Sequence, residues 1–314
     1  MERPLVKAAC VDTRFPPERP RLRKAVNNFG MRTAGRIATG LHALLGSRAH
    51  ERVGILTYHR VAPRVRRIPP PSHNVTPERL REQIEGLLRR GFHVWPLRRI
   101  VHDAAEGREI PPRTIVITFD DGFESVFVRA WPILRELQVP ATLFVNTGYL
   151  DSTDPFPFDT WGGAWKDCVP PESYRPLTSA QCRELQVSGL IDLGTHTHTH
   201  ADFRNRPEEF REDLQLSVSI LRTRFGIDEV PFAFPFGSPA LGFCGGELMQ
   251  AARDTGVVCG LTTECVLIDR ASDPLQWGRF NAFGWDTSAT LAAKLAGWYS
   301  WATKLRQRLA GAGR

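Results

Sequence analysis

The sequence predicts an α/β protein whose parallel strands form a sheet that is closed or nearly closed into a barrel. Residues 114–118 and 140–145 are apolar runs with the length and β-branched content of buried strands. Residues 123–137, which lie between them, favour a helix. Strands that alternate with helices indicate parallel pairing. With 314 residues, 42% of them hydrophobic, the chain suffices for one large domain of this class or two small ones.

Residues 1–50 differ from the rest and are predicted to form an irregular N-terminal extension. Basic residues are scattered through a stretch that contains prolines, and no apolar run follows it. This pattern is a poor match to a secretory signal peptide. Residues 37–46 are too short to span a bilayer. They indicate either an amphipathic helix on a membrane surface, with Arg32, Arg36 and Arg48 facing headgroups, or a helix packed against the barrel. We therefore expect a cytoplasmic protein or one peripheral to the membrane.

The first strand is predicted at residues 52–61, and it carries His59 near its end. A proline-rich loop follows. A threonine and a proline then begin a helix over residues 76–90, which a glycine ends. A second strand is expected at residues 92–95 and a short helix at residues 100–105.

Two carboxylates directly follow the apolar run that starts at Thr114. Asp120 and Asp121 sit at the C-terminal end of this predicted strand, and Gly122 allows a tight exit from it. Adjacent aspartates repel each other, so burying both costs free energy unless a cation or a shared proton relieves the repulsion. A metal is the simplest relief, and a capped turn without function is the structural alternative.

Three histidines follow a later strand. A helix at residues 177–188 precedes the apolar run 190–193, and His196, His198 and His200 come next. If the strand continues, all three side chains point to one face. If the chain turns helical, His196 and His200 meet while His198 points away. Either geometry supplies two neutral nitrogen ligands, and one aspartate would complete a three-ligand hydrolytic metal site.

The motifs at residues 118–122 and 196–200 resemble the first two motifs of the polysaccharide deacetylase family, the NodB-homology carbohydrate esterases. The likeness covers roughly residues 52–285. Tyr58-His59 in the first strand is similar to a pair in the branch that acts on poly-N-acetylglucosamine. Together with the alternation of elements, the resemblance implies a distorted (β/α) barrel of about seven parallel strands over residues 51–288.

The resemblance also implies roles for the motif residues. Asp120 corresponds to the general base, and Asp121, His196 and His200 to the ligands of a divalent metal. Zinc is favoured by ligand softness, and cobalt or nickel would also suit. Many members place a histidine as general acid where this chain has threonines, so the candidate proton donors are His59, His198 and a metal-bound water.

The third motif departs from the common pattern of the family. In many members it runs Arg-x-Pro-Tyr-Gly, whereas this chain has Ala233 at the arginine position and Phe236 at the tyrosine position. The arginine normally orients the catalytic aspartate, so another group must hold Asp120. Arg279, on a later strand, is the candidate. Alanine-bearing versions also occur in the poly-N-acetylglucosamine branch.

Residues 147–176 interrupt the alternation with an insertion rich in aromatic residues and proline. On the rim of a barrel such rings could stack against sugars, or they could pack against one another and cover the barrel. We predict Trp161, Trp165, Phe236 and Arg279 as substrate-binding residues.

The remaining elements continue the same alternation. Helices are expected at residues 207–225 and 247–255, and strands at residues 257–263 and 275–281, the last of which would close the barrel. Residues 289–314 are predicted as a basic amphipathic C-terminal helix, with Trp298, Tyr299 and Trp301 either in the core or at an interface.

The net charge of +7 arises from arginines spread over several helices, and no block of like charge resembles a nucleic-acid-binding arm. We expect weak attraction to anionic surfaces or glycans and no nucleic-acid partner. The six cysteines show no CxxC spacing, so buried thiols are favoured over a disulfide framework.

These observations predict a hydrolase that removes the N-acetyl group of an amino sugar in a polysaccharide or glycolipid with the help of a metal. Two alternatives remain open at the level of sequence. The missing arginine and histidine could mark an inactive barrel that binds glycan in polysaccharide assembly, or the chain could hydrolyse a non-sugar amide. The four intact motif residues favour catalysis over binding alone.

Overall fold

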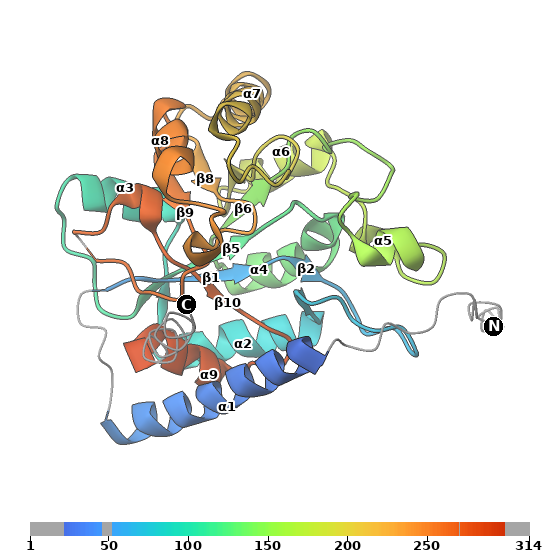
Figure 1. Ribbon diagram of the computed structural model, residues 1–314. Coiled ribbons are helices and arrows are strands. Elements are labelled where there is room, and N and C mark those ends of the chain that lie inside the picture. The colour runs from blue at the N-terminus through green and yellow to red at the C-terminus, as the bar shows by residue number, and fades with distance from the viewer. Residues whose placement is uncertain (1–21, 46–51, 270, 299–314) are drawn as a thin grey trace.

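A curved parallel sheet forms the centre of the protein (Figure 1). The structure, a computed structural model, describes residues 22–45, 52–269 and 271–298. Seven strands follow one another in the order β10-β1-β5-β6-β7-β8-β9, all in parallel. They are β1 (Gly54–Tyr58), β5 (Thr114–Phe119), β6 (Ala141–Val145), β7 (Ile191–Thr195), β8 (Pro231–Ala233), β9 (Cys259–Leu261) and β10 (Phe280–Asn281). The predicted α/β class and the sheet of about seven parallel strands are confirmed.

The segment that leads into β10 contacts both ends of this sheet. Trp277 forms a parallel bridge with Leu261 of β9, and Phe280 pairs with Leu56 of β1. The last predicted strand therefore closes the barrel as expected. Its regular part is shorter than predicted, since a 3₁₀ turn, η4 (Pro274–Gln276), precedes it.

Three short strands and a ring of helices complete the fold. β4 (His93–Val94) pairs with β5 but is not part of the seven-strand order given above. β2 (Arg60–Val61) pairs with β3 (Asn74–Val75) in a separate small sheet. The helices between the strands include α2 (Pro77–Arg89), α3 (Leu97–Ala105), η1 (Val126–Ala130), α4 (Trp131–Leu137), α5 (Thr160–Ala164), η2 (Pro171–Ser173), α6 (Ser179–Val187), α7 (Pro207–Phe225), η3 (Pro239–Leu241) and α8 (Gly246–Asp254). Local signals set several helix ends: the Thr76 hydroxyl accepts a hydrogen bond from the Arg79 amide, and Gly226, at φ 66°, ends α7.

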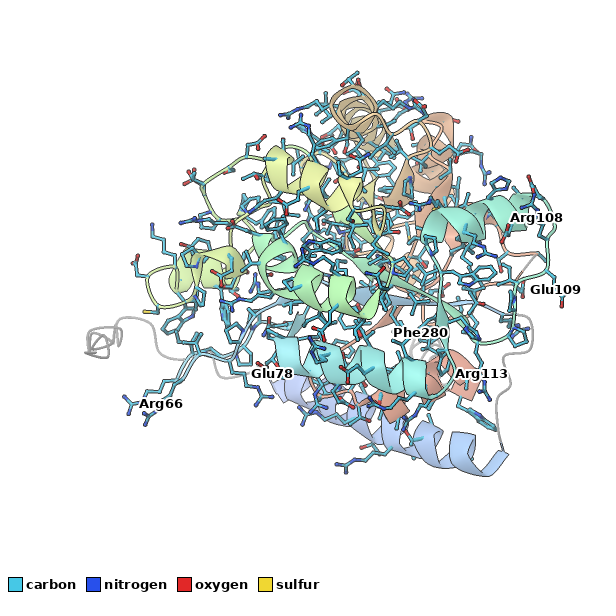
Figure 2. All side chains as sticks on the ribbon, turned by 180° about the vertical axis from the view of Figure 1, so that it is seen from behind. Arg66, Glu78, Arg108, Glu109, Arg113 and Phe280 are labelled. Atoms are coloured by element: carbon cyan, nitrogen blue, oxygen red, sulfur yellow. The ribbon has the colours of Figure 1, made fainter. Side chains whose placement is uncertain are left out.

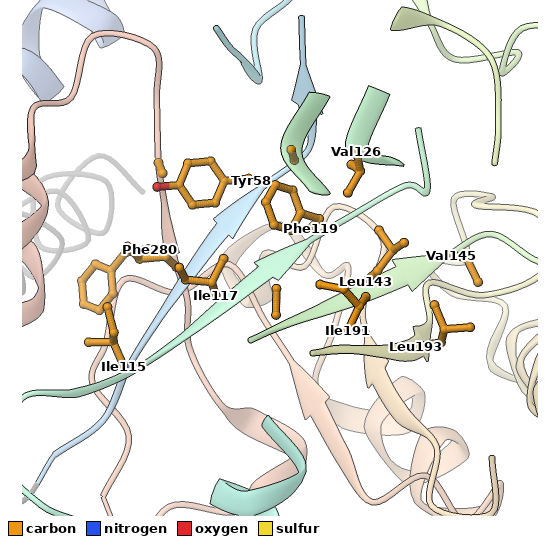
Figure 3. Close-up of a cluster of buried hydrophobic side chains, with 14 of the residues drawn as sticks. Tyr58, Ile115, Ile117, Phe119, Val126, Leu143, Val145, Ile191, Leu193 and Phe280 are labelled. Carbon is orange, nitrogen blue, oxygen red and sulfur yellow. The ribbon is translucent and has the colours of Figure 1, made fainter. Parts of the chain in front are cut away.

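Both faces of the sheet are buried, which explains why its strands are continuous apolar runs. Ile115, Ile117 and Phe119 of β5 lie with Leu143 and Leu193 of the next two strands in the core under the helices (Figure 3). The alternate residues face the other way. They form a second cluster with Val116, Phe144 and Trp277, among others. Since side chains alternate along a strand, β5 contributes to both cores at once.

The terminal helices pack together on the outside of the barrel. α1 (Leu22–Leu45) lies along α9 (Ser288–Ala293) and the π-helical turn η5 (Lys294–Trp298), as Figure 1 shows. Ala38 of α1 is fully buried, and Trp298 is 5% exposed. The predicted continuous C-terminal helix is interrupted at Gly297, whose φ is 83°. Arg48, Tyr299 and Trp301 lie outside the described residues.

No helix in the described ranges is long and apolar enough to cross a membrane.

Charged side chains of both signs are interspersed on the surface. Figure 2 labels five exposed examples, namely Arg66, Glu78, Arg108, Glu109 and Arg113. Exposed basic residues thus occur together with exposed acidic ones.

The cysteines follow the prediction in part. Cys182, Cys244 and Cys259 are buried free thiols. Cys168 is disulfide-bonded, so buried thiols do not account for every cysteine.

We predict that Gly194→Ala destabilises the barrel. A Cβ at position 194 of β7 would stand 2.6 Å from the Phe144 ring and 2.7 Å from the Pro231 carbonyl oxygen. Overpacking of this kind costs about 1–3 kcal/mol in the free energy of unfolding, which denaturant titration would measure. Gly163→Ala is the control, because nothing lies within 4 Å of its Cβ position. Equal stability of the two variants would contradict the proposed packing.

Candidate metal and catalytic site

Three predicted ligands meet at the C-terminal ends of β5 and β7. Asp121 follows β5, and His196 and His200 follow β7. One Asp121 carboxylate oxygen lies 3.6 Å from Nε2 of His196 and 3.5 Å from Nε2 of His200. The three candidate donor atoms lie within 4.8 Å of one another, and all three side chains are buried. We call these residues the triad.

The turn after β7 brings two of its histidines together and sends the third away. The backbone is neither a continued strand nor a helix, since Thr197 and His200 have φ values of 70° and 55°. The rings of His196 and His200 are 5.0 Å apart. His198 instead hydrogen-bonds through Nδ1 to the Thr147 hydroxyl at 3.0 Å. The structure therefore does not bring His198 into the triad.

The hydrogen bonding of His196 leaves its other nitrogen available. Its Nδ1 lies 2.8 Å from the Ala233 carbonyl oxygen, which can only accept, so Nδ1 carries the proton. Nε2 then presents a lone pair toward Asp121. Metal-binding histidines commonly have this arrangement, in which a backbone carbonyl sets the tautomer.

Burial keeps the triad uncharged. Burial lowers the pKa of His196. Burial, followed by the nearby His196, lowers the pKa of His200 to about 3. Burial, followed by the negative charge of Asp120, raises the pKa of Asp121 to about 8. Although Asp121 lies close to both histidines, these contacts are thus not ion pairs between charged groups.

The triad fits a divalent cation. Two neutral imidazole nitrogens and one carboxylate oxygen converge in a buried place, and a cation there would stabilise the ionised form of Asp121. The donor set suits zinc, as it suits cobalt and nickel.

Arg279 holds Asp120 in place of the missing arginine. Nη1 and Nη2 of Arg279 donate to the two carboxylate oxygens of Asp120 at 2.7 Å and 2.8 Å. Burial alone would raise the pKa of Asp120, but the positive Arg279, with smaller contributions from His196 and His59, lowers it below the usual range. Arg279 is 1% exposed, so its prediction as a substrate-binding residue is wrong, whereas the prediction that it orients Asp120 is confirmed.

His59 lies beside Asp120. Tyr58 of β1 pairs with Phe119 of β5, and the Asp120 amide donates to the Tyr58 carbonyl at 2.9 Å. His59 and Asp120 therefore directly follow the paired ends of two adjacent strands. His59 is half-buried and stacks on His73 with ring centroids 4.5 Å apart. Burial and then His73 lower the pKa of His59 well below its ordinary value. The structure brings His59 to the site through strand register.

The aromatic residues near the triad differ in part from those predicted. Trp161 is 1% exposed and donates from its indole nitrogen to the Pro69 carbonyl, so its prediction as a sugar-binding residue is wrong. Trp165 is half-buried and packs against the small hydrophobic cluster that contains Trp161. Phe158, from the same insertion, is instead 38% exposed and stacks on His200 at 4.3 Å. Phe236 is 47% exposed and contacts the His200 ring edge to face, with ring centroids 4.9 Å apart.

Arg60 is a site residue that the sequence analysis missed. Its side chain is 3% exposed, pairs with Asp159 and lies over the Phe123 ring at 4.2 Å. Asp159 follows Phe158 and also accepts from the Gly162 amide at 2.7 Å, where it caps α5 (Thr160–Ala164). The pair therefore anchors the segment that carries Phe158. An arginine directly after the Tyr-His pair of a buried strand was the available signal.

Comparison with known proteins identifies the family. The family model for polysaccharide deacetylase matches residues 107–259. This range contains both aspartates, the triad histidines and Ala233. Residues 107–259 form a polysaccharide deacetylase domain. His59 and Arg279 come from outside the matched range, directly after β1 and directly before β10, and complete the site.

Relatives of this chain include two proteins named poly-β-1,6-N-acetyl-D-glucosamine N-deacetylase. The protein from Staphylococcus epidermidis is 23% identical over 202 residues, which are 62% of this chain and 62% of that protein. The protein from Escherichia coli K12 is 26% identical over 204 residues, which are 56% of this chain and 29% of that protein. The chain thus spans less than two thirds of either relative.

Solved structures show the same fold. IcaB from Ammonifex degensii superposes with a TM-score of 0.63 at 22% identity, covering 80% of this chain and 98% of that one. The deacetylase PplD from Streptococcus pyogenes, solved with acetate, has a TM-score of 0.64 at 18% identity, covering 78% and 98%.

We predict that His196→Ala lowers zinc affinity by more than about 100-fold, because it removes a ligand rather than a group that merely orients one. Isothermal titration with zinc, after removal of bound metal, would measure the affinity. His198→Ala is the matched control from the same turn and should bind zinc like the wild type. An equal loss in both variants would contradict the assignment of the triad.

We predict that Arg279→Met lowers the free energy of unfolding at pH 7 by about 3–5 kcal/mol, because it leaves the buried Asp120 charge unpaired. The low pKa of Asp120 stabilises the wild type above the unfolded pKa of about 4, and this contribution is lost as the pH falls further. In the variant Asp120 becomes neutral as the pH falls. The difference between the two proteins should therefore shrink below about pH 4.

Arg98→Met is the control for this measurement. Arg98 is 57% exposed and pairs with Asp192 at the surface, so its loss should cost no more than about 1 kcal/mol. A similar cost for both arginines would show that the Asp120 pair contributes no more than a surface pair.

Proposed function

We propose that this protein hydrolyses the N-acetyl group of an N-acetylated amino sugar in a polysaccharide, releasing acetate and leaving a free amine. Two relatives carry the name of poly-β-1,6-N-acetyl-D-glucosamine N-deacetylase, which supports a glycan of that type as substrate. The observation that carries the proposal is the buried pair of Asp120 and Arg279 beside the triad. It supplies the aspartate orientation that the altered third motif lacks.

The triad would hold a divalent cation. When bound, such an ion supplies Lewis-acid polarisation and lowers the pKa of a water molecule toward neutrality. Asp121, His196 and His200 contribute one donor atom each, so further positions remain for water and substrate.

Asp120 acts as the base in this proposal. Each of its oxygens accepts one hydrogen bond from Arg279, which leaves lone pairs on both oxygens for a water proton. Its lowered pKa keeps it ionised and therefore ready to accept. Water adds to the acetyl carbon as Asp120 takes the proton, and the C–N bond then breaks.

We assign protonation of the leaving amine to His59. It directly follows β1, whose last residue pairs with the residue before Asp120, whereas His198 is hydrogen-bonded to Thr147 outside the triad. Since burial keeps His59 neutral before reaction, the proton that it donates must originate from the attacking water. A base and an acid side by side allow that transfer within one turnover.

We predict that the purified protein releases acetate from β-1,6-linked N-acetylglucosamine oligomers and that a chelator abolishes this release. Added zinc or cobalt should restore it, because the triad supplies ligands that suit either ion. Enzymatic detection of acetate would follow the reaction. Release that persists after complete removal of metal would contradict the proposed role of the triad.

We predict that Asp120→Asn lowers kcat by about 10²–10⁴-fold while zinc affinity stays within a few-fold of wild type, because the amide cannot accept the water proton. Acetate release and zinc titration on the same preparation would separate the two properties. A fully active Asp120→Asn protein would rule out Asp120 as the base.

A further inference from the structure

A surface hollow of about 560 Å³ lies near the triad, and neither the motifs nor the comparisons assign it a role. Two loops form it. Asp202, Arg204, Asn205 and Arg206 come from the segment between β7 and α7, and Leu241 and Gly242 come from the segment between β8 and α8. Its volume falls in the range of small-molecule sites, which is roughly 300–1,000 Å³.

A line of aromatic contacts joins this hollow to the triad. The Phe236 ring lies 4.9 Å from the ring of His200 and 4.7 Å from that of Phe243. The Arg204 guanidinium then lies over Phe243 at 4.3 Å from the ring centroid. A series of contacts through the Phe236 and Phe243 rings thus connects the hollow to the triad.

The loop that carries Phe236 is held firmly. Phe236 has a backbone φ of 61°, which residues other than glycine rarely adopt. The Thr263 hydroxyl donates to the Phe236 carbonyl at 3.1 Å, and the Thr263 amide donates to the Gly237 carbonyl at 2.7 Å. The Cys244 thiol donates to the same Gly237 carbonyl at 3.3 Å. The aromatic connection is therefore built into the fold.

The charges that line the hollow are paired. Arg204 binds Asp202 through Nε and Nη2, the latter at 2.6 Å, and Arg206 binds Glu209 at 2.8 Å. A site whose charges are already neutralised favours an uncharged polar ligand over a free anion or cation.

The hollow also offers free polar and apolar groups. The Asn205 side-chain amide has no hydrogen-bond partner among the described residues, and it can both donate and accept. Leu241, on the opposite loop, is 63% exposed. An amide and an apolar side chain that face one ligand suit a sugar ring, which carries hydroxyl groups on its edge and C–H groups on its faces.

We propose that the hollow is a second glycan-binding subsite that holds an N-acetylated sugar of the same chain whose acetyl group reacts at the triad. This inference rests on the proposed function. Because two aromatic rings separate the hollow from His200, one sugar cannot occupy both places. The substrate is therefore a chain of several linked sugars rather than a single lipid-linked sugar.

The test measures how binding depends on chain length. Zinc-loaded Asp120→Asn protein, which should bind without turnover, is titrated with β-1,6-linked N-acetylglucosamine dimer and hexamer. We expect the hexamer to bind at least about tenfold more tightly than the dimer. Asn205→Gly and Leu241→Ala, each added to this background, should reduce that ratio severalfold. Glycine is chosen because Asn205 has a φ of 61°.

Leu216→Ala is the matched control, because Leu216 is an exposed leucine of α7 that does not line the hollow. It should leave the hexamer-to-dimer ratio unchanged. A ratio near one in the parent protein, or a ratio that neither hollow variant alters, would overturn the inference.

The same materials separate this inference from the proposed function. If the wild type releases no acetate from any oligomer, the proposed function fails, and the binding ratios alone decide whether the hollow binds glycan. If the wild type releases acetate while the ratios do not respond to the hollow variants, the function stands and the subsite is refuted.

Discussion

Two adjacent buried carboxylates are the constraint on which the rest of this structure depends. Asp120 and Asp121 are 2% and 8% exposed, and their charges would repel each other at the end of one strand if both were ionised. The protein relieves the repulsion in two different ways. Arg279 neutralises Asp120 through two hydrogen bonds, and His196 and His200 surround Asp121 with donors suited to a cation. Two neighbouring residues of one type thereby acquire opposite pKa shifts and different chemical roles.

Closure of the barrel is what makes the first of these solutions available. Arg279 lies in the segment that bridges β9 and β1, directly before β10. Its guanidinium can reach Asp120 because this segment completes the sheet next to β1, the neighbour of β5. In the third motif, Ala233 contributes a backbone carbonyl to His196 instead of a charged side chain. A departure in one motif is thus balanced by a residue about forty-five positions later that shares the same barrel interior.

Several residues around the mouth of the barrel have an uncommon backbone conformation. Asp121, Thr197, His200 and Phe236 all have positive φ, as does Asn205 in the hollow. Conformations of this kind persist where surrounding hydrogen bonds enforce them, and they are typical of functional sites. The loops after β5, β7 and β8 therefore present their side chains in fixed positions. The aromatic insertion lies against one part of the site, since the buried Arg60–Asp159 pair anchors the segment in which Phe158 stacks on His200.

The sequence by itself determined most of the strands, the helix boundaries set by caps and glycines, and the motifs that contain the triad. Strands and helix boundaries depend on local patterns, such as apolar period and a threonine before a proline, whereas the choice of the three ligands followed from the resemblance of the motifs. Only the tertiary structure decided that His198 turns away, because the strand and helix geometries were both compatible with its spacing. It also decided that Trp161 is buried while Phe158 is exposed, and that two loops some forty residues apart form one hollow. Exposure and convergence depend on contacts between distant segments, and no local pattern encodes those contacts.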